Sequence, residues 1–258
     1  MTVTENVSVP ASRLLRWEIV VVFAVSLGAS AVYALVDLIA SLTAHQSLSQ
    51  QTATLNGSLS PRPLLDLFLQ LIDITFALAP VALVLYLMAR VGEGPRTIGL
   101  DRDHPGKDLL KGAILAALIG FSGLALYLTA YHLGASLDVV PEDLPDVWWR
   151  IPVLILSAAQ NATVEEVIVV GYLLTRLDKL GVAPGKQIAI SALIRGSYHL
   201  YQGFGAFIGN ATMGVIFAYL YKRWGRVTPL IIAHTLIDSV AFVGYALLVG
   251  HVSWIPKP

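Results

Sequence analysis

Long apolar segments alternate with short polar segments along most of the chain. A transmembrane α-helix needs about 20 predominantly apolar residues, and seven segments approach or exceed that length. The pattern therefore predicts an all-α fold, a polytopic helical membrane protein with about seven transmembrane helices. The predicted spans are residues 17–42, 64–88, 109–133, 148–174, 187–201, 204–221 and 228–249, of which the fifth and sixth are the shortest.

The composition is typical of a chain that lies mostly in lipid. Hydrophobic residues make up 56% of the chain and charged residues 13%, whereas soluble domains carry about 25% charged residues. Mean hydropathy is +0.71. The net charge is zero, so we expect no nucleic-acid partner. The absence of cysteine excludes disulfides, thiolate metal ligands and a cysteine nucleophile.

The positions of lysine and arginine predict the orientation, because cytoplasmic loops retain positive charge. With the N-terminus inside, the outside segments hold only Arg62, Arg150 and Lys257. The segment 138–146 carries acids and no base, as suits an outside loop. We therefore predict an N-in, C-out topology. The cytoplasmic segments then hold Arg13, Arg16, Arg90, Arg96, Arg102, Lys107, Lys111, Arg176, Lys179, Lys186, Lys222, Arg223 and Arg226.

The predicted organisation has two parts. The polar segments 45–63 and 91–107 are too short to hold a further domain. Residues 1–147 are expected to form three N-terminal spans with their loops. Residues 148–250 are expected to form a helix core that carries the functional site.

Two adjacent carboxylates, Glu165 and Glu166, lie in the apolar run 151–171. Placing an ionisable side chain inside a membrane span is costly, so such a residue indicates a functional site. Neighbouring residues on an α-helix diverge by about 100°. We therefore expect Glu165 to face the site and Glu166 to hold a structural cation.

Two further helix segments carry polar residues one turn apart. Arg195 and His199 are spaced i, i+4, as are His234 and Asp238, and this spacing places each pair on one helix face. Measured from the basic residue at the inner end of each helix, a rise of 1.5 Å per residue places Glu165, His199 and His234 at broadly similar depths of about 12–20 Å. The sequence therefore predicts one polar site among the four C-terminal helices.

One carboxylate and two imidazoles allow two hydrolytic schemes. In the first, Glu165, His199 and His234 hold a divalent metal, for which zinc is the expected ion, and the metal activates water. In the second, Glu165 alone is the general base and the histidines donate hydrogen bonds to the oxyanion. Asp238 is either a ligand or the group that orients His234. The sequence has no His-Glu-x-x-His, Gly-x-Ser-x-Gly or phosphate-loop motif.

These motifs resemble the CPBP family of intramembrane metalloproteases, which includes CAAX prenyl proteases and bacteriocin-processing (Abi) proteins. The family pattern is Glu-Glu-x-x-x-Arg, Phe-x-x-x-His and His-x-x-x-Asn or Asp. Here Glu165-Glu166 is followed by Gly171-Tyr172, by Ser191-Ala-Leu-Ile-Arg-Gly-Ser-Tyr-His-Leu200, by Gly214 and Tyr221, and by Pro229-Leu-Ile-Ile-Ala-His-Thr-Leu-Ile-Asp238. The resemblance covers residues 148–245.

The resemblance implies roles for single residues. Glu165 resembles the water-activating glutamate, His199 the second site residue, and His234 with Asp238 the third motif. It also implies an integral protein of a bacterial cell membrane that reaches its site from the cytosol. Its substrate would be a membrane-associated protein or peptide, and its surroundings the lipid bilayer.

The chain departs from the family pattern at two positions. Val170 occupies the place of the motif arginine, and Arg195 occupies the place of the motif phenylalanine. An unpaired Glu166 in hydrocarbon would be costly. We therefore predict that the cation has moved to a neighbouring helix and that Arg195 pairs with Glu166.

The predicted function is that of an intramembrane, metal-dependent endopeptidase. Two alternatives stay open. A family member without proteolytic activity would serve as a membrane chaperone or immunity factor, and a proton- or ion-coupled transporter would use the same buried groups as a relay. Four aromatic residues, Tyr198, Tyr201, Trp148 and Trp149, are interpreted as interfacial anchors. For the two tyrosines, which flank His199, the alternative is that they line a substrate path.

Overall fold

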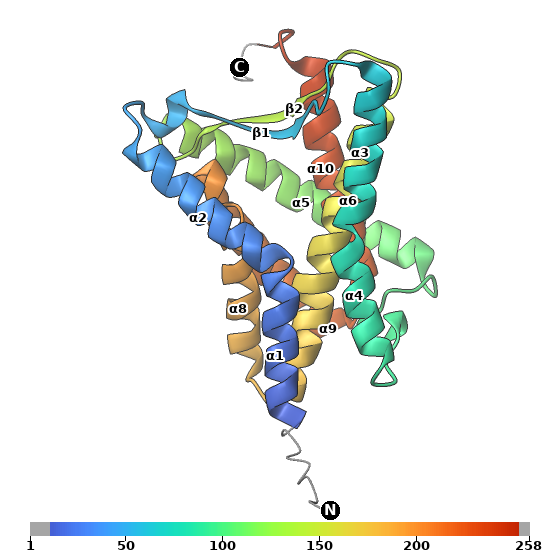
Figure 1. Cartoon of the computed structure of the whole chain (residues 1–258). Helices are drawn as coiled ribbons and strands as arrows, with labels where there is room; N and C mark the ends of the chain where they lie inside the picture. The colour runs from blue at the N-terminus through green and yellow to red at the C-terminus, as the bar shows by residue number, and fades with distance from the viewer. Residues whose placement is uncertain (1–10, 253–258) are drawn as a thin grey trace, which may run out of the picture.

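The computed structural model describes residues 11–252, and most of them are helical (Figure 1). The predicted helical membrane fold is confirmed, apart from one small sheet. The helices are α1 (Ala11–Ala24), α2 (Leu27–Thr43), α3 (Pro63–Ala77), α4 (Ala79–Ala89), α5 (Pro105–His132), α6 (Arg150–Glu165), α7 (Leu173–Lys179), α8 (Pro184–Ser197), α9 (Phe204–Trp224) and α10 (Thr228–Leu248). Short 3₁₀ turns η1 (Leu48–Gln50), η2 (Pro95–Ile98) and η4 (Leu200–Gln202) and the π-helical segment η3 (Glu166–Tyr172) complete the helical structure.

Five helical runs within the described residues are long and apolar enough to cross a membrane. They are Pro63–Ala89, Pro105–His132, Arg150–Lys179, Phe204–Trp224 and Thr228–Leu248. The helices α1 and α2 give a sixth span if they are counted together across their 51° bend.

The structure therefore supports five or six spans by length and composition, whereas the sequence pattern predicts about seven. The fifth predicted span, residues 187–201, falls on α8, which has only 14 residues. Gln187, Ser191 and Arg195 follow one another at i, i+4 on this helix, and all three are fully buried. A polar row on the inner face explains why α8 lacks the continuous apolar character of a span.

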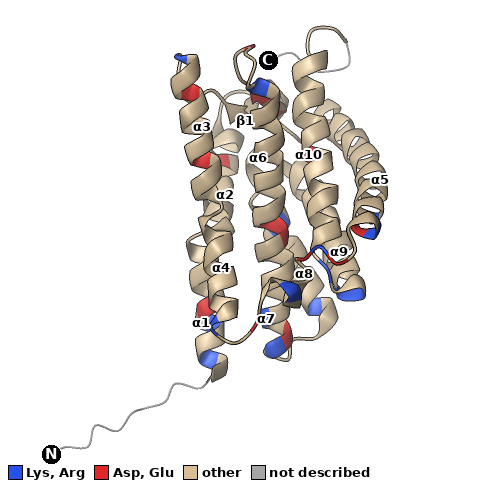
Figure 2. Cartoon of the chain, turned by 90° about the vertical axis from the view of Figure 1, so that its right-hand side faces the viewer, with Lys and Arg blue, Asp and Glu red and all other residues tan. Residues whose placement is uncertain are grey.

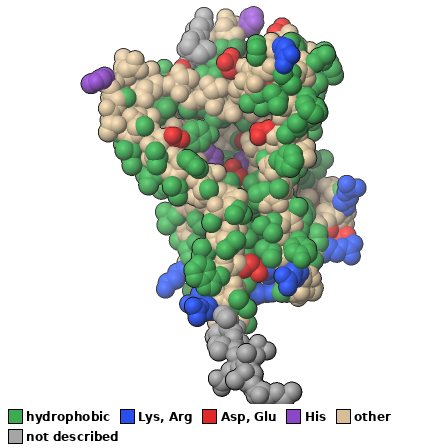
Figure 3. Space-filling view, in the orientation of Figure 1, with side chains coloured by type: hydrophobic (Ala, Val, Ile, Leu, Met, Phe, Trp, Pro, Cys, Tyr) green, Lys and Arg blue, Asp and Glu red, His purple; other side chains and the backbone are tan. Residues whose placement is uncertain are grey.

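Charge is distributed unevenly between the two ends of the helix bundle. Lysine and arginine side chains gather at the lower end in Figures 2 and 3, where α1 begins, and α10 ends at the opposite end (Figure 1). This distribution is the one that the N-in orientation requires. The orientation itself stays a prediction.

The run α6–η3–α7 lies at the centre of the bundle and supplies much of its core. All seven residues of η3 are buried. The helix α6 packs against α10 and α3, α8 packs against α9, and α5 packs against α10. Burying one large aliphatic side chain stabilises a soluble fold by about 1.5–3 kcal/mol, but in lipid the close packing itself must hold the helices together.

A small parallel sheet crosses the upper part of the bundle, below the upper ends of α3 and α10 (Figure 1). Strand β1 (Thr52–Gly57) pairs with β2 (Asp138–Asp143), and Thr52 lies opposite Asp138 in the register. The all-α expectation is wrong for these two segments. The two strands are far apart in the sequence, and a pairing at that distance leaves no local pattern.

The tryptophan pair near the start of α6 is split by the fold. Trp148 is 79% exposed, whereas Trp149 is only 1% exposed. Trp149 packs with Val153 and Phe242 in a hydrophobic cluster of α6 and α10, called the upper core cluster below. The interpretation of Trp149 as an interfacial anchor is therefore wrong, because its ring faces the protein interior.

An ionic network ties three segments together at the basic end. Arg176 on α7 is 1% exposed and donates hydrogen bonds to Glu18 on α1 at 2.9 Å and to Glu93 at 2.5 Å. Lys179 contacts Glu93 at 2.6 Å. Burial opposes ionisation of Glu93, but the hydrogen bonds from Lys179 and Arg176 outweigh it and hold the pKa of this carboxyl below its usual range.

We expect Glu93→Gln to lower the stability of the protein by about 1.5–3 kcal/mol at pH 7, the usual contribution of a hydrogen bond to a charged group. The folded-state pKa of Glu93 lies below the unfolded value. Its ion pairs therefore stabilise the fold above about pH 4.5 and lose this effect as the pH falls through the folded-state value. Thermal unfolding in detergent at pH 7 and at pH 3 measures this. A difference between wild type and variant that stays the same at both pH values would contradict the assignment.

Candidate active site

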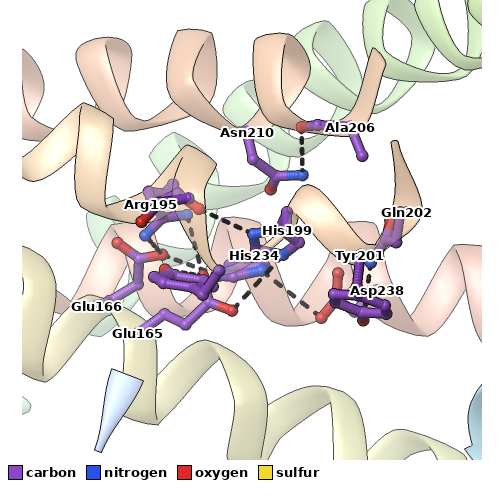
Figure 4. A network of polar contacts seen from close by, with 12 residues as sticks. Glu165, Glu166, Arg195, His199, Tyr201, Gln202, Ala206, Asn210, His234 and Asp238 are labelled. Carbon is purple, nitrogen blue, oxygen red and sulfur yellow. Dashed lines mark hydrogen bonds and ion pairs between the residues drawn. The ribbon is translucent and has the colours of Figure 1, made fainter. Parts of the chain in front are cut away.

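The six residues predicted for the site come together in one network of polar contacts (Figure 4). Glu165 and Glu166 lie where α6 passes into η3, Arg195 lies in the last turn of α8, and His199 follows that helix. His234 and Asp238 lie one turn apart on α10. The predicted position among the C-terminal helices is the observed one.

Glu166 and Arg195 form the buried side of the site. Both side chains are 0% exposed, and Arg195 Nη2 donates a hydrogen bond to Glu166 Oε1. His234 Nδ1 lies 2.8 Å from the same oxygen. The predicted pairing of Arg195 with Glu166 is confirmed, and Glu166 also holds the imidazole of His234.

Glu165 points to a different set of partners. Tyr198 donates a hydrogen bond from its hydroxyl to Glu165 Oε2 at 2.7 Å. Arg195 Nη1 lies 3.6 Å from the same oxygen, and His199 Nε2 lies 4.0 Å from Glu165 Oε1. The two carboxylates thus diverge as predicted, although one guanidinium lies close to both.

Hydrogen bonds indicate which ring nitrogen of His199 carries the proton. His199 Nδ1 lies 3.0 Å from the carbonyl oxygen of Arg195. A carbonyl oxygen only accepts, so Nδ1 is the protonated nitrogen in the neutral ring. The lone pair of Nε2 then faces Glu165.

The imidazole of His234 lies between two carboxylates. Its Nδ1 contacts Glu166, and its Nε2 lies 3.6 Å from Asp238 Oδ2. Asp238 is therefore placed to orient the ring, as the i, i+4 spacing predicts.

A π-helical turn positions both carboxylates. Segments of π-helix are rare and are frequent at functional sites. In η3 the carbonyl of Val169 accepts a hydrogen bond from Ser191 Oγ of α8 at 2.9 Å. This bond joins the wide turn to the helix that carries Arg195.

Close packing of α8 on α9 positions the arginine. A Cβ at Gly214 of α9 would lie 2.8 Å from Ala192 Cα and 3.3 Å from Arg195 Cδ. The arginine also lies over the ring of Phe217, 5.2 Å from its centroid. Glycine at position 214 therefore makes room for the guanidinium between the two helices.

One side of the site is open. The side chains of Glu165, His199 and Asp238 are 11%, 16% and 20% exposed, in contrast to the closed Glu166–Arg195 pair. Figure 3 shows a hollow on this face, with histidine and acidic side chains at its bottom. A substrate in the hollow would therefore meet Glu165, His199 and Asp238 first.

The donor atoms fit a divalent cation. One ligand atom each from Glu165, Glu166 and His234 lie within 4.8 Å of one another. Three carboxylates, those of Glu165, Glu166 and Asp238, lie around a single guanidinium, that of Arg195, so acidic groups outnumber basic ones at the site. The sequence predicts His199 as a ligand in place of Glu166, and the structure places His199 beside Glu165 but outside this set of three.

Tyr198 is the residue that the sequence interpretation missed. Its ring is 5% exposed, packs on His199 with centroids 4.8 Å apart, and directs its hydroxyl at Glu165. The interpretation as an interfacial anchor is wrong because the ring lies inside the bundle. Its position directly before His199 is the signal that points to the site.

Comparison with known families identifies the part of the chain that holds the site. The family described as Type II CAAX prenyl endopeptidase Rce1-like matches residues 147–240. This range includes all six predicted residues and supports peptidase activity at the level of the family. Comparisons with curated proteins and with solved structures give no match. Over residues 147–240 the chain is therefore similar to the Rce1-like domain of the CPBP family.

Proposed function

We propose that the protein is an intramembrane endopeptidase that hydrolyses a peptide bond of a membrane-associated protein or peptide. One observation carries this proposal: the Rce1-like domain assembles Glu165, His199, His234 and Asp238 around one partly open polar site in the bundle. General-base hydrolysis needs a carboxylate that reaches both water and substrate. Glu165 satisfies this requirement and Glu166, closed in by Arg195, does not.

We infer different tasks for the two oxygens of Glu165 from their contacts. Tyr198 and Arg195 approach Oε2, while Oε1 is the oxygen nearest to His199. Oε1 is therefore the atom that takes a proton from the attacking water and later delivers it to the leaving amine. Tyr198 and Arg195 hold the carboxylate in place during both transfers.

The two histidines have ligand chemistry. Neutral His199, protonated on Nδ1, presents a lone pair and no donor at Nε2. This favours the scheme with a metal over the scheme in which the histidines donate to an oxyanion. Glu166 and His234 would hold a divalent ion next to Glu165, His199 would add its Nε2, and zinc is the ion we expect. When bound, the ion would act as a Lewis acid on the substrate carbonyl.

We expect close to one metal ion per chain in protein purified without chelators, since carboxylate and imidazole groups bind such ions tightly. Replacing both site histidines, in His199→Ala His234→Ala, should remove it. His132→Ala is the matched control, because His132 is exposed on α5 and bonds only to its own helix. Elemental analysis of the folded proteins measures the ratio. A metal-free wild type that still hydrolyses peptide would mean that Glu165 acts without a metal.

Hydrolysis is tested with the protein reconstituted in liposomes. The probe is a dye-labelled peptide with about ten residues before a farnesylated cysteine, two aliphatic residues and a variable residue, called the CAAX peptide below. We expect mass spectrometry to show two products that together contain one added water. An intact peptide would overturn the proposed function. Proton flux across the liposomes without hydrolysis would support the transporter alternative instead.

A further inference from the structure

Strand β1 is an edge strand with one side of its backbone free. The amide of Asp138 donates to the carbonyl of Gln51 at 2.9 Å, and Thr52 is the register partner of Asp138. In a parallel ladder a residue bonds to the two neighbours of its partner. Residues 51, 53, 55 and 57 therefore turn their backbone groups toward β2, and Thr52, Thr54 and Asn56 turn theirs away.

The outward groups of β1 have no hydrogen-bond partner within residues 11–252. Each of the three residues offers one N–H and one C=O at intervals of two residues. Unpaired edges are templates for another strand, and proteins normally blunt or cover them. The strand itself, Thr-Ala-Thr-Leu-Asn-Gly, contains no charged residue and no proline.

The inward side chains of β1 place it over the site. Ala53 packs in a cluster with Tyr201, two residues beyond His199, and Leu55 packs against the upper core cluster of α6 and α10. Figure 4 shows Tyr201 beside Asp238. Figures 1 and 3 share one orientation, in which β1 crosses above the hollow that opens to the site.

Side-chain hydrogen bonds fix the C-terminal end of β1. Asn56 donates from Nδ2 to the carbonyl of Pro141 at 2.8 Å and accepts from Ser157 Oγ of α6 at 2.7 Å. Gln70 of α3 donates to the carbonyl of Gly57 at 2.9 Å. The edge is therefore fixed to both α3 and α6 before any partner binds, which lowers the entropic cost of binding.

We propose that the free edge of β1 binds the peptide substrate as an added strand and directs it into the hollow. This inference rests on the proposed function. A row of alternating donors and acceptors is matched by another extended backbone, and the hollow below leads to Glu165. The occupant is thus an extended segment of the substrate, recognised by its backbone. The predicted topology places β1 at the outer end of the bundle, so this route replaces the cytosolic access that the family resemblance implies.

The distance from β1 to the site predicts where the substrate is cut. Ser157, which holds Asn56, precedes Glu165 by eight residues on α6, or about 12 Å of helix axis. An extended peptide spans this distance in about four residues at roughly 3.3 Å each. The cleaved bond should lie about four residues from the segment that pairs with β1.

Thr54→Pro tests the edge directly. Proline removes the outward N–H and leaves the β1–β2 ladder intact, because the ladder uses the neighbouring residues. We expect the dissociation constant of the CAAX peptide, measured by fluorescence anisotropy, to rise about fivefold to tenfold, the loss of one hydrogen bond. Thr54→Ala keeps the N–H and should bind as wild type. An unchanged dissociation constant in folded Thr54→Pro would overturn strand addition.

A second probe does not depend on how the variant folds. N-methylation of the CAAX peptide at single amides should weaken binding at every second residue within the paired segment, because only alternate amides face β1. Uniform effects along the peptide, or none, would overturn strand addition. If wild type binds with this alternation but does not hydrolyse the peptide, strand addition stands and the proposed function fails.

Discussion

Glu165→Gln is expected to lower the rate of hydrolysis of the CAAX peptide by about 10²- to 10⁴-fold, the usual contribution of a general base. The amide has the shape of the carboxylate and cannot take a proton from water. Its carbonyl oxygen still accepts the hydrogen bond that Tyr198 donates at 2.7 Å in the wild type. The melting temperature in detergent should therefore stay close to that of wild type.

The matched control for this prediction is Asp73→Asn. Asp73 is an exposed carboxylate on α3 outside the site, so its loss should leave both hydrolysis and stability unchanged. Single-turnover kinetics separate the chemical step from binding. A Glu165→Gln protein that retains the wild-type rate would remove Glu165 from the mechanism, and Asp238 would become the next candidate base.

The sequence predicts the helical fold because the physical signal is local. A helix that crosses lipid must be apolar over its own length, and five of the predicted spans appear as such helical runs. The helix α8 is different, because its polar face is buried against other helices. Burial of Gln187, Ser191 and Arg195 is a tertiary property that a hydropathy pattern does not contain.

The parallel sheet could not be predicted from the sequence, because its two strands are distant from each other along the chain. The segment Thr52–Gly57 has no apolar alternation strong enough to predict a strand, and its partner is Asp138–Asp143. Such strands form because the helices bring their ends together. The edge that we assign to substrate binding therefore becomes visible only in the folded chain.

The sequence predicts which residues form the site, because their charge and their depth in a membrane span can both be read from it. Ionisable groups in lipid-facing sequence are costly, so Glu165, Glu166, His199 and His234 stand out from their apolar surroundings. The same cost predicts the partner of Glu166, since Arg195 is a cation in the middle of a predicted span, away from its ends. The charge and depth of a residue do not indicate how its helix is rotated about its own axis. For that reason the sequence does not indicate that His234 contacts Glu166, or that Tyr198 points inward.

Separating Arg195 from Glu166 is expected to have the largest effect on stability. Both side chains are 0% exposed, and their hydrogen bond joins α8 to η3. Removing one member of a buried ion pair leaves an uncompensated charge, which typically costs about 3–5 kcal/mol. Arg195→Gln and Glu166→Gln should each destabilise the protein by about this amount.

Arg195→Lys separates charge from geometry. The guanidinium reaches Glu166 with Nη2 and lies 3.6 Å from Glu165 with Nη1. A lysine ammonium is a single point charge and does not span two carboxylates in this way. We expect Arg195→Lys to be more stable than Arg195→Gln and less stable than wild type. It should also hydrolyse peptide more slowly than wild type, because Glu165 loses one of the groups that hold it.

A double-mutant cycle on thermal stability in detergent tests the pair itself. The double variant Arg195→Gln Glu166→Gln leaves no unpaired charge between α8 and η3, so it should be more stable than the sum of the two single losses predicts. His234 also contacts Glu166 at 2.8 Å, but this contact is lost equally in the single and double Glu166 variants and cancels in the cycle. Effects that add within about 0.5 kcal/mol would show that the two side chains do not interact directly. The cation would then have to be reassigned to Glu165, and the interpretation of Glu166 as the closed partner would fail with it.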